Sequence, residues 1–273
     1  MQLRTRVDPV DFPEPGQTTV LRLGLQPLDS RRWLHVDADF PQFHAHKLQQ
    51  QEIRPQTVCQ TLSGCEPALA ELGTTILAHL QADHQQHYAV GTDCLTHRQS
   101  GLSWPLEIEN LWQVSLWVQE DLCVLQQRDG GYQLTAASVC SPSNWDPSSK
   151  IGRSLSGIHD PVPGYEAELA GRVDRLFRSL KPGKPLLRYN WSLQAGNELY
   201  WESDPAKPAG RPTHWRVERQ TLRRLPQSGA IIFAIRIYLH LWHSYAQIHS
   251  WQPTSTRSWQ PCQRNSERTR LWC

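Results

Sequence analysis

The most apolar stretch of the chain, residues 230–242 (AIIFAIRIYLHLW), constrains the fold more than any other segment. It is 13 residues long and contains Arg236, whereas a helix needs about 20 apolar residues to span a bilayer. Its β-branched and aromatic side chains predict a buried strand over Ala230–Leu239. Arg216–Leu222 is a second strand candidate, and residues 225–229 (LPQSG) form a hairpin-type connection between the two. The pattern therefore predicts an antiparallel pair.

A second hairpin and two helices are predicted earlier in the chain. Leu122–Leu125 and Tyr132–Cys140 are strand-like and flank the turn signal at residues 129–131 (DGG). Apolar residues at helical spacing predict short helices over Lys150–His159 and Tyr165–Leu180. Strands, central helices and further strands in one chain indicate an α+β fold with helices on one face of an antiparallel sheet.

The N-terminal half carries a further helical segment. Apolar spacing predicts a helix over Pro67–Val90, with Pro67 in its first turn. Residues 108–122 fit a helix or a strand equally well, and residues 41–65 allow no assignment. Asp37 and Asp39 are expected at the surface.

Composition and motifs exclude several classes of protein. The chain has 273 residues with 28 basic and 26 acidic side chains, which argues against a dedicated nucleic-acid binder. Its N-terminus has no apolar core of a signal peptide, so a cytoplasmic protein is expected. Seven cysteines without CxxC or CxxCH argue against attached c-type haem and against an iron–sulfur cluster in this chain. Neither GxGxxG nor a P-loop is present.

Three groups of side chains are weak candidates for ligand chemistry. The histidines of residues 79–87, together with an aspartate, could bind a metal on one helix face, although a solvated helix face is favoured. Those residues are His79, Asp83, His84 and His87. A second pair, His44 and His46, would share a face only if the two residues lay on a strand. Cys123 and Cys140 lie in strand-like runs where buried, inert thiols are the usual outcome.

Six sequence blocks in a fixed order carry a resemblance to a known family. They are LGLQPLDxxxWLHVDADFP, QEDLC, xAAxxCxPSxW, KIG with IHxPVPGY, RxNW, and xVERQTLxRLPxSGAIxFxIRxY. Over roughly residues 22–239 the chain resembles the haem-dependent oxidative N-demethylase α-subunit family, also called dimethylamine mono-oxygenase-like. The resemblance implies a PAS-like haem-binding domain over residues 21–239. Composition predicts an extended, proline-rich arm before it (1–20) and an atypical, disordered tail after it (240–273).

The same resemblance implies a chemistry. A haem-dependent mono-oxygenase subunit of this kind uses haem b and O2 to convert a small secondary amine, such as dimethylamine, to a primary amine and formaldehyde. Electrons come from a partner reductase, and NAD(P)H, flavin and iron–sulfur centres belong to other subunits. No nucleic acid and no membrane are expected as partners.

His159 is the leading candidate for the haem iron ligand. It ends the apolar stripe of Ile151, Leu155 and Ile158, next to a proline-stiffened turn, which suits a proximal histidine. Alternatives are a C-terminal histidine that interacts with the helix dipole, or a place on the distal side of the haem. Tyr165 is a candidate donor to bound O2.

Glu218 is the leading candidate for binding the amine. By resemblance it faces a pocket, holds the ammonium group and later accepts a proton, and Asp160 is an alternative anion. A surface ion pair is the competing interpretation of Glu218, and a helix cap or packing role competes for Asp160 and Tyr165.

A basic stretch surrounds Glu218 in the sequence. Arg219, Arg223 and Arg224 are candidates for the haem propionates, because arginine pairs bidentately with carboxylates. Lys150 is a weaker candidate for the same role, and an exposed charged strand face is the alternative.

Two other functions stay open at the level of sequence. A non-catalytic PAS-type gas or redox sensor would keep the haem and lose turnover, since fold does not determine function. A haem-free interaction protein is the weaker alternative. A polar pocket that holds Glu218 favours the enzyme, and an apolar pocket favours a gas sensor.

Overall fold

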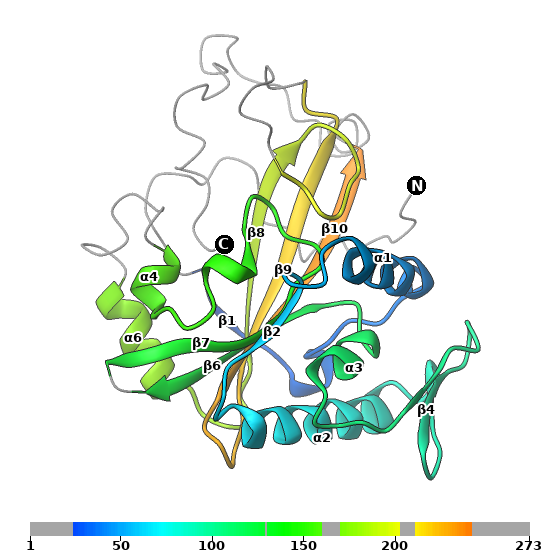
Figure 1. Ribbon diagram of the computed structural model, residues 1–273, viewed down its shortest axis with the longest axis horizontal. Helices are drawn as coiled ribbons and strands as arrows, with labels where there is room; N and C mark the ends of the chain where they lie inside the picture. Colours follow the sequence, from blue (N-terminus) through cyan, green and yellow to red (C-terminus); the bar gives the residue numbers. More distant parts are fainter. Residues whose placement is uncertain (1–23, 129, 160–169, 203–210, 242–273) are drawn as a thin grey trace.

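A large antiparallel sheet with helices on both faces organises the chain (Figure 1). This computed structural model describes residues 24–128, 130–159, 170–202 and 211–241. The α+β class predicted from the sequence is confirmed. In spatial order the sheet contains β1 (Gln26–Pro27), β8 (Leu186–Gln194), β9 (His214–Arg224), β10 (Ile231–Leu241), β6 (Asp121–Arg128), β7 (Gly131–Ser138) and β2 (Cys59–Thr61).

Both predicted hairpins are present. The turn between β6 and β7 contains Gly130 and Gly131 at φ of 88° and 123°, a region that glycine adopts without steric cost. β9 pairs with β10 along its whole length, from the pair Arg224 and Ile231 to the ends of both strands. The β10–β6 pairing then joins the two hairpins into one sheet.

The remaining elements are helices and a small second sheet. The helices are α1 (Phe40–Ile53), α2 (Glu66–Asp83), α3 (Leu111–Leu116), α4 (Leu155–His159) and α6 (Ala170–Ser179), with single 3-10 turns η2 (Ser30–Arg32) and η3 (Pro147–Ser149). The second sheet contains β3 (Tyr88–Val90), β4 (Cys94–His97) and β5 (Ser103–Pro105). It projects beside the end of α2 (Figure 1). None of the helices that the structure describes is long and apolar enough to cross a membrane.

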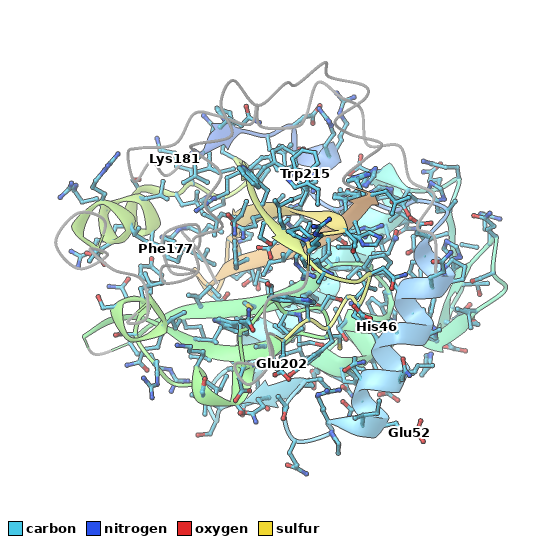
Figure 2. The ribbon with its side chains drawn as sticks, turned by 90° about the horizontal axis from the view of Figure 1, so that it is seen from above. His46, Glu52, Phe177, Lys181, Glu202 and Trp215 are labelled. Atoms are coloured by element: carbon cyan, nitrogen blue, oxygen red, sulfur yellow. The ribbon has the colours of Figure 1, made fainter. Side chains whose placement is uncertain are left out.

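Side-chain alternation along the strands divides the core into two layers. Leu122 and Val124 of β6 pack into the layer that contains α2 and α3. Cys123 and Leu125 of the same strand pack into the layer that contains α4 and α6. Figure 2 shows Phe177 of α6 and, at the other side of the view, His46 of α1. The expectation of helices on one face was therefore wrong, because the N-terminal helices cover the second face.

Two predicted helix boundaries are corrected by local geometry, and one ambiguous segment is assigned. The helix predicted to reach residue 90 ends at Asp83, and residues 88–90 form β3 instead. The helix predicted over residues 150–159 begins only at Leu155, because Gly152 takes a positive φ of 78°. The ambiguous segment 108–122 contains the helix α3 and the start of β6.

The predicted exposure of Asp37 and Asp39 was wrong. Asp37 and Asp39 are mostly shielded from solvent, and Asp37 accepts a hydrogen bond from the buried Arg236 at 2.9 Å. His44 and His46 lie on the helix α1 rather than on a strand. Two positions apart on a helix, they point in different directions: Trp104 donates to His44 at 3.2 Å, whereas His46 Nε2 lies 2.7 Å from the carbonyl oxygen of Cys140.

Candidate functional site

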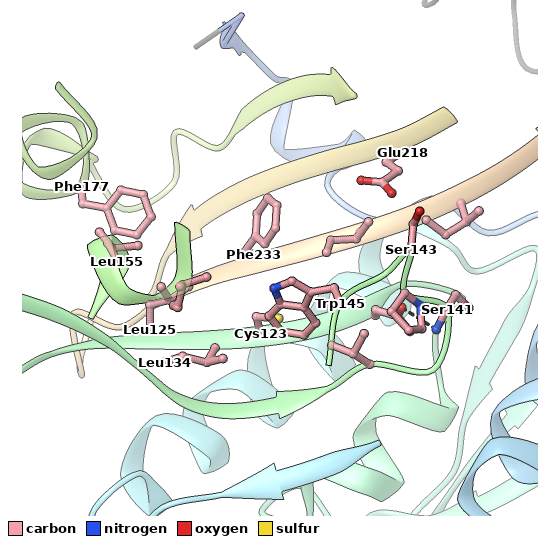
Figure 3. Close-up of a pocket in the computed structure, with 16 residues that line it drawn as sticks. Cys123, Leu125, Leu134, Ser141, Ser143, Trp145, Leu155, Phe177, Glu218 and Phe233 are labelled. Carbon is pink, nitrogen blue, oxygen red and sulfur yellow. Dashed lines mark hydrogen bonds between the residues drawn. The ribbon is translucent and has the colours of Figure 1, made fainter. Parts of the chain in front are cut away.

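A pocket opens between the sheet and the helices α4 and α6 (Figure 3). Its unfilled space is about 670 Å³, counted with the part that is continuous with solvent. One end of the pocket is apolar. That end is lined by Cys123, Leu125, Leu134, Leu155, Ile158 and Phe177.

The other end of the pocket is polar. Glu218 reaches it from β9, Asp121 from the start of β6, and Ser141 and Ser143 from the loop after β7 (Figure 3). Two β-branched side chains of β10, Ile235 and Ile237, also line the pocket. The ligand that this pocket accepts would therefore have a large apolar part and a smaller polar part.

Glu218 is buried and hydrogen-bonded on both carboxylate oxygens. The residue is 5% exposed. Oε2 accepts hydrogen bonds from Gln220 at 2.9 Å and from Asn190 at 3.4 Å, and Oε1 accepts one from Arg216 Nε at 3.3 Å. This burial excludes the interpretation of Glu218 as part of a surface ion pair.

The second carboxylate of the pocket, Asp121, has a structural set of partners. It accepts hydrogen bonds from the backbone N–H groups of Cys140 at 2.9 Å and Ser141 at 2.8 Å. Burial raises the pKa of the Asp121 carboxyl, and the nearby Lys47 ammonium opposes that rise. Burial in turn lowers the pKa of Lys47, whose ammonium donates to three backbone carbonyls, at Ser115, Val118 and Glu120. Asp121 therefore fixes the loop that forms the polar wall.

His159 is the last residue of α4, and the two pocket-lining residues Leu155 and Ile158 precede it in the same helix. The described backbone thus places residue 159 directly after a pocket-lining residue, and its role as iron ligand stays a prediction. Asp160 and Tyr165 lie outside the described residues.

The predicted propionate ligands Arg219 and Arg223 lie on the opposite face of the sheet from Glu218. Arg219 donates to the backbone carbonyl of Trp33 at 3.1 Å, and the guanidinium of Arg223 lies 4.3 Å from the centroid of the Trp33 ring. Arg219 is buried, so the alternative of an exposed charged strand face does not hold for it.

Arg224 shares the pocket face, but its guanidinium already has partners. It donates to the carbonyls of Leu180 at 2.7 Å and Gly229 at 2.9 Å and to the Tyr132 hydroxyl at 2.7 Å. Lys150 follows η3 and does not line the pocket.

The weaker metal and thiolate candidates find no support in the geometry. Among the described residues, no group of three or more histidine, cysteine, aspartate or glutamate side chains could hold a metal ion. His79 instead pairs with Asp83 at 2.9 Å. Burial raises the pKa of the Cys123 and Cys140 thiols, which disfavours a thiolate at either position.

Sequence reasoning missed several residues of the polar wall, although the resembling blocks contain them. Asp121 belongs to QEDLC, Ser141 and Trp145 lie at or beside the CxPSxW positions, and Asn190 belongs to RxNW. Ser141 Oγ and Trp145 Nε1 are buried and have no hydrogen-bond partner among the described residues. Both therefore offer donors to a bound ligand.

This geometry defines an α+β protein whose central sheet carries a largely apolar pocket with a buried carboxylate at one end. Comparison with known protein families matches residues 24–262 to the family described as haem-dependent oxidative N-demethylase, alpha subunit-like. The chain belongs to this family. The match runs past residue 239, where the resemblance was expected to end, and includes the first part of the predicted tail.

Proposed function

We propose that this chain is the haem-binding catalytic subunit of an oxidative N-demethylase. The observation that carries the proposal is the pocket, which has α4, ending in His159, on one wall and Glu218 at its polar end. We propose a PAS-like domain over residues 21–239. Its support is the topology: a hairpin, a helical middle, and three further antiparallel strands whose last strand returns to the first hairpin.

The residues of the pocket fit haem b. Aliphatic and aromatic walls suit a flat apolar macrocycle, and the buried donors of Ser141 and Trp145 have no other partner among the described residues. His159 would ligate the iron. Of the three arginines proposed for the propionates, Arg224 is the one on the pocket face.

When bound, haem with O2 would supply the oxidising chemistry. The proposed reaction takes one dimethylamine, one O2, two electrons and two protons to methylamine, formaldehyde and water. Glu218 would bind the ammonium group of the amine and accept its proton. Asp160 and Tyr165 keep their proposed roles as an alternative anion and a donor to O2.

Partner subunits would complete the reaction. The family description names an alpha subunit, which implies further subunits. We propose that one of them is a reductase that takes electrons from NAD(P)H through flavin and an iron–sulfur centre. A cytoplasmic location would suit such an assembly.

A gas or redox sensor is the less supported function. An apolar pocket would suit a sensor, whereas the buried, hydrogen-bonded Glu218 gives this pocket a group that can bind an amine. Turnover distinguishes the two, because a sensor would bind haem and release no formaldehyde from dimethylamine.

Absorption spectra after haem reconstitution test the proposal. The oxidised and dithionite-reduced protein should show a Soret band with one haem per chain, and dimethylamine should shift it. The band should be lost in His159→Ala and kept in the control His87→Ala, which lies between α2 and β3. Haem retained in His159→Ala would move the iron ligand to another residue, and a wild-type protein without haem would overturn the proposed function.

A further inference from the structure

We propose that Arg216 is a positioning residue that holds Glu218 as an oriented carboxylate for the amine. This inference rests on the proposed function, because it assumes that Glu218 binds an ammonium group. Arg216, Glu218 and Gln220 alternate along β9 and point to the same face. Arg216 is 0% exposed, so its charge is fully withdrawn from water.

All three nitrogen atoms of the Arg216 guanidinium are engaged. Nε donates to Glu218 at 3.3 Å, Nη1 donates to the carbonyl of Leu199 at 3.0 Å and to Gln194 Oε1 at 3.4 Å, and Nη2 donates to the carbonyl of Ser141. One planar fork thus joins the pocket carboxylate to the loop that forms the polar wall. A lysine has the charge but cannot reproduce this fork.

Among the side chains that the structure describes, Arg216 is the cation that forms an ion pair with Glu218. The other charged groups near this end are Asp121 on β6, Lys47 on α1, whose charge opposes the effect of burial on Asp121, and the buried Arg188 on β8, which pairs in register with Gln220. The β10 residues beside Glu218 in the pocket, Ile235 and Ile237, are apolar. A buried carboxylate that loses its charged partner takes up a proton rather than staying ionised, and a neutral acid no longer attracts an ammonium.

The test is a double-mutant cycle read by calorimetric titration with dimethylammonium chloride between pH 6 and pH 9. Alkylammonium groups stay protonated over this range. We expect Arg216→Gln to weaken amine binding about tenfold at pH 7, with recovery toward pH 9. In a Glu218→Gln background the same substitution should change the affinity by less than twofold, because the group that Arg216 positions is gone.

Two variants separate positioning from general damage to the fold. Arg216→Lys keeps the charge but not the planar set of donors, so the affinity should fall by only about threefold. Arg236→Gln removes an equally buried arginine that serves Asp37 on the other face, and it should leave amine affinity unchanged. If Arg216→Gln does not fold, by circular dichroism, the cycle is run with Arg216→Lys, whose loss must likewise disappear in Glu218→Gln.

The outcomes separate this inference from the proposed function. An equal loss in both backgrounds, or no loss with Arg216→Gln, would overturn the positioning role. A wild-type protein that binds haem but no dimethylammonium would also overturn it and leave haem binding intact. A protein that binds dimethylammonium with the expected cycle but takes up no haem would support Arg216 and refute the oxygenase.

Discussion

Substituting alanine for Gly73 should destabilise the protein, although alanine is the better helix former. Gly73 lies within α2, and a Cβ atom there would lie 2.0 Å from the carbonyl oxygen of Ile108 and 2.7 Å from its carbonyl carbon. Ordinary contact begins at 3.4 Å, so the loop before α3 would have to move by about 1.4 Å. Backbone atoms, unlike the end of a flexible side chain, cannot make room cheaply.

The two opposing effects can be compared. Alanine in place of glycine in a helix gains about 1 kcal/mol, whereas overpacking that shifts the backbone costs about 1–3 kcal/mol or more. The overlap at Gly73 is severe, so we expect a net loss of about 2 kcal/mol. For a chain of this size that corresponds to a melting temperature lower by roughly 4–8 °C.

Gly171→Ala is the matched control. Gly171 is exposed on α6, and a Cβ atom there would meet only the end of Arg175 at 3.6 Å. It should be stabilising by about 0.5–1 kcal/mol. Urea denaturation followed by tryptophan fluorescence measures both variants. A Gly73→Ala protein as stable as the wild type would refute the close approach of α2 to residue 108.

Three further perturbations have expected outcomes. Burial lowers the pKa of His97, which is 0% exposed, to about 4. As the pH drops from 6.5 to 4 the unfolded chain binds the proton first, so His97 lowers the free energy of unfolding by about 3 kcal/mol. Urea denaturation across that range should show a smaller loss of stability for His97→Gln than for the wild type. The Glu71 carboxylate accepts hydrogen bonds from two backbone N–H groups of the β9–β10 turn, at 2.6 and 2.7 Å. In the same assay Glu71→Gln should lower the free energy of unfolding by about 2 kcal/mol. The control Glu66→Gln, at an exposed position, should change it by much less. Arg219→Gln should lower thermal stability and leave the haem spectrum unchanged, and loss of haem would place Arg219 at the propionates.

The sequence allowed the strands with local signals to be predicted. β6 and β7 flank a glycine turn, and β9 and β10 flank a turn that is closed by a hydrogen bond from the Leu225 N–H to the Ala230 carbonyl. β8 carries no such signal: most of its residues are half-buried, without a two-residue alternation. Its place comes from pairing with β9 along its whole length, which is a long-range interaction that local pattern does not encode.

The helix α1 was missed for a different reason. Its buried face includes His44, Lys47 and Gln50, so the apolar period that identifies a helix is absent. These polar groups are tolerated because the fold supplies partners, such as the three carbonyls around Lys47. Sequence patterns predict that a polar residue is exposed when its hydrogen-bond partner is distant in the sequence. For the same reason Asp37 and Asp39 were predicted at the surface.

The candidate site shows where sequence reasoning about function stops. Glu218 was predicted from its charge and the resemblance; the structure shows it buried at a pocket, and its role in binding an amine stays a prediction. The arginines around it were predicted as a group because they are neighbours in the sequence. On a strand, however, neighbours alternate between faces, so Arg219 faces Trp33 while Arg216 and Arg224 share the face of Glu218. The partner of Glu218 is therefore Arg216, two positions earlier on the same face of β9, and not Arg219, which follows Glu218 directly and lies on the opposite face. Arg216 is the arginine whose substitution we expect to weaken amine binding.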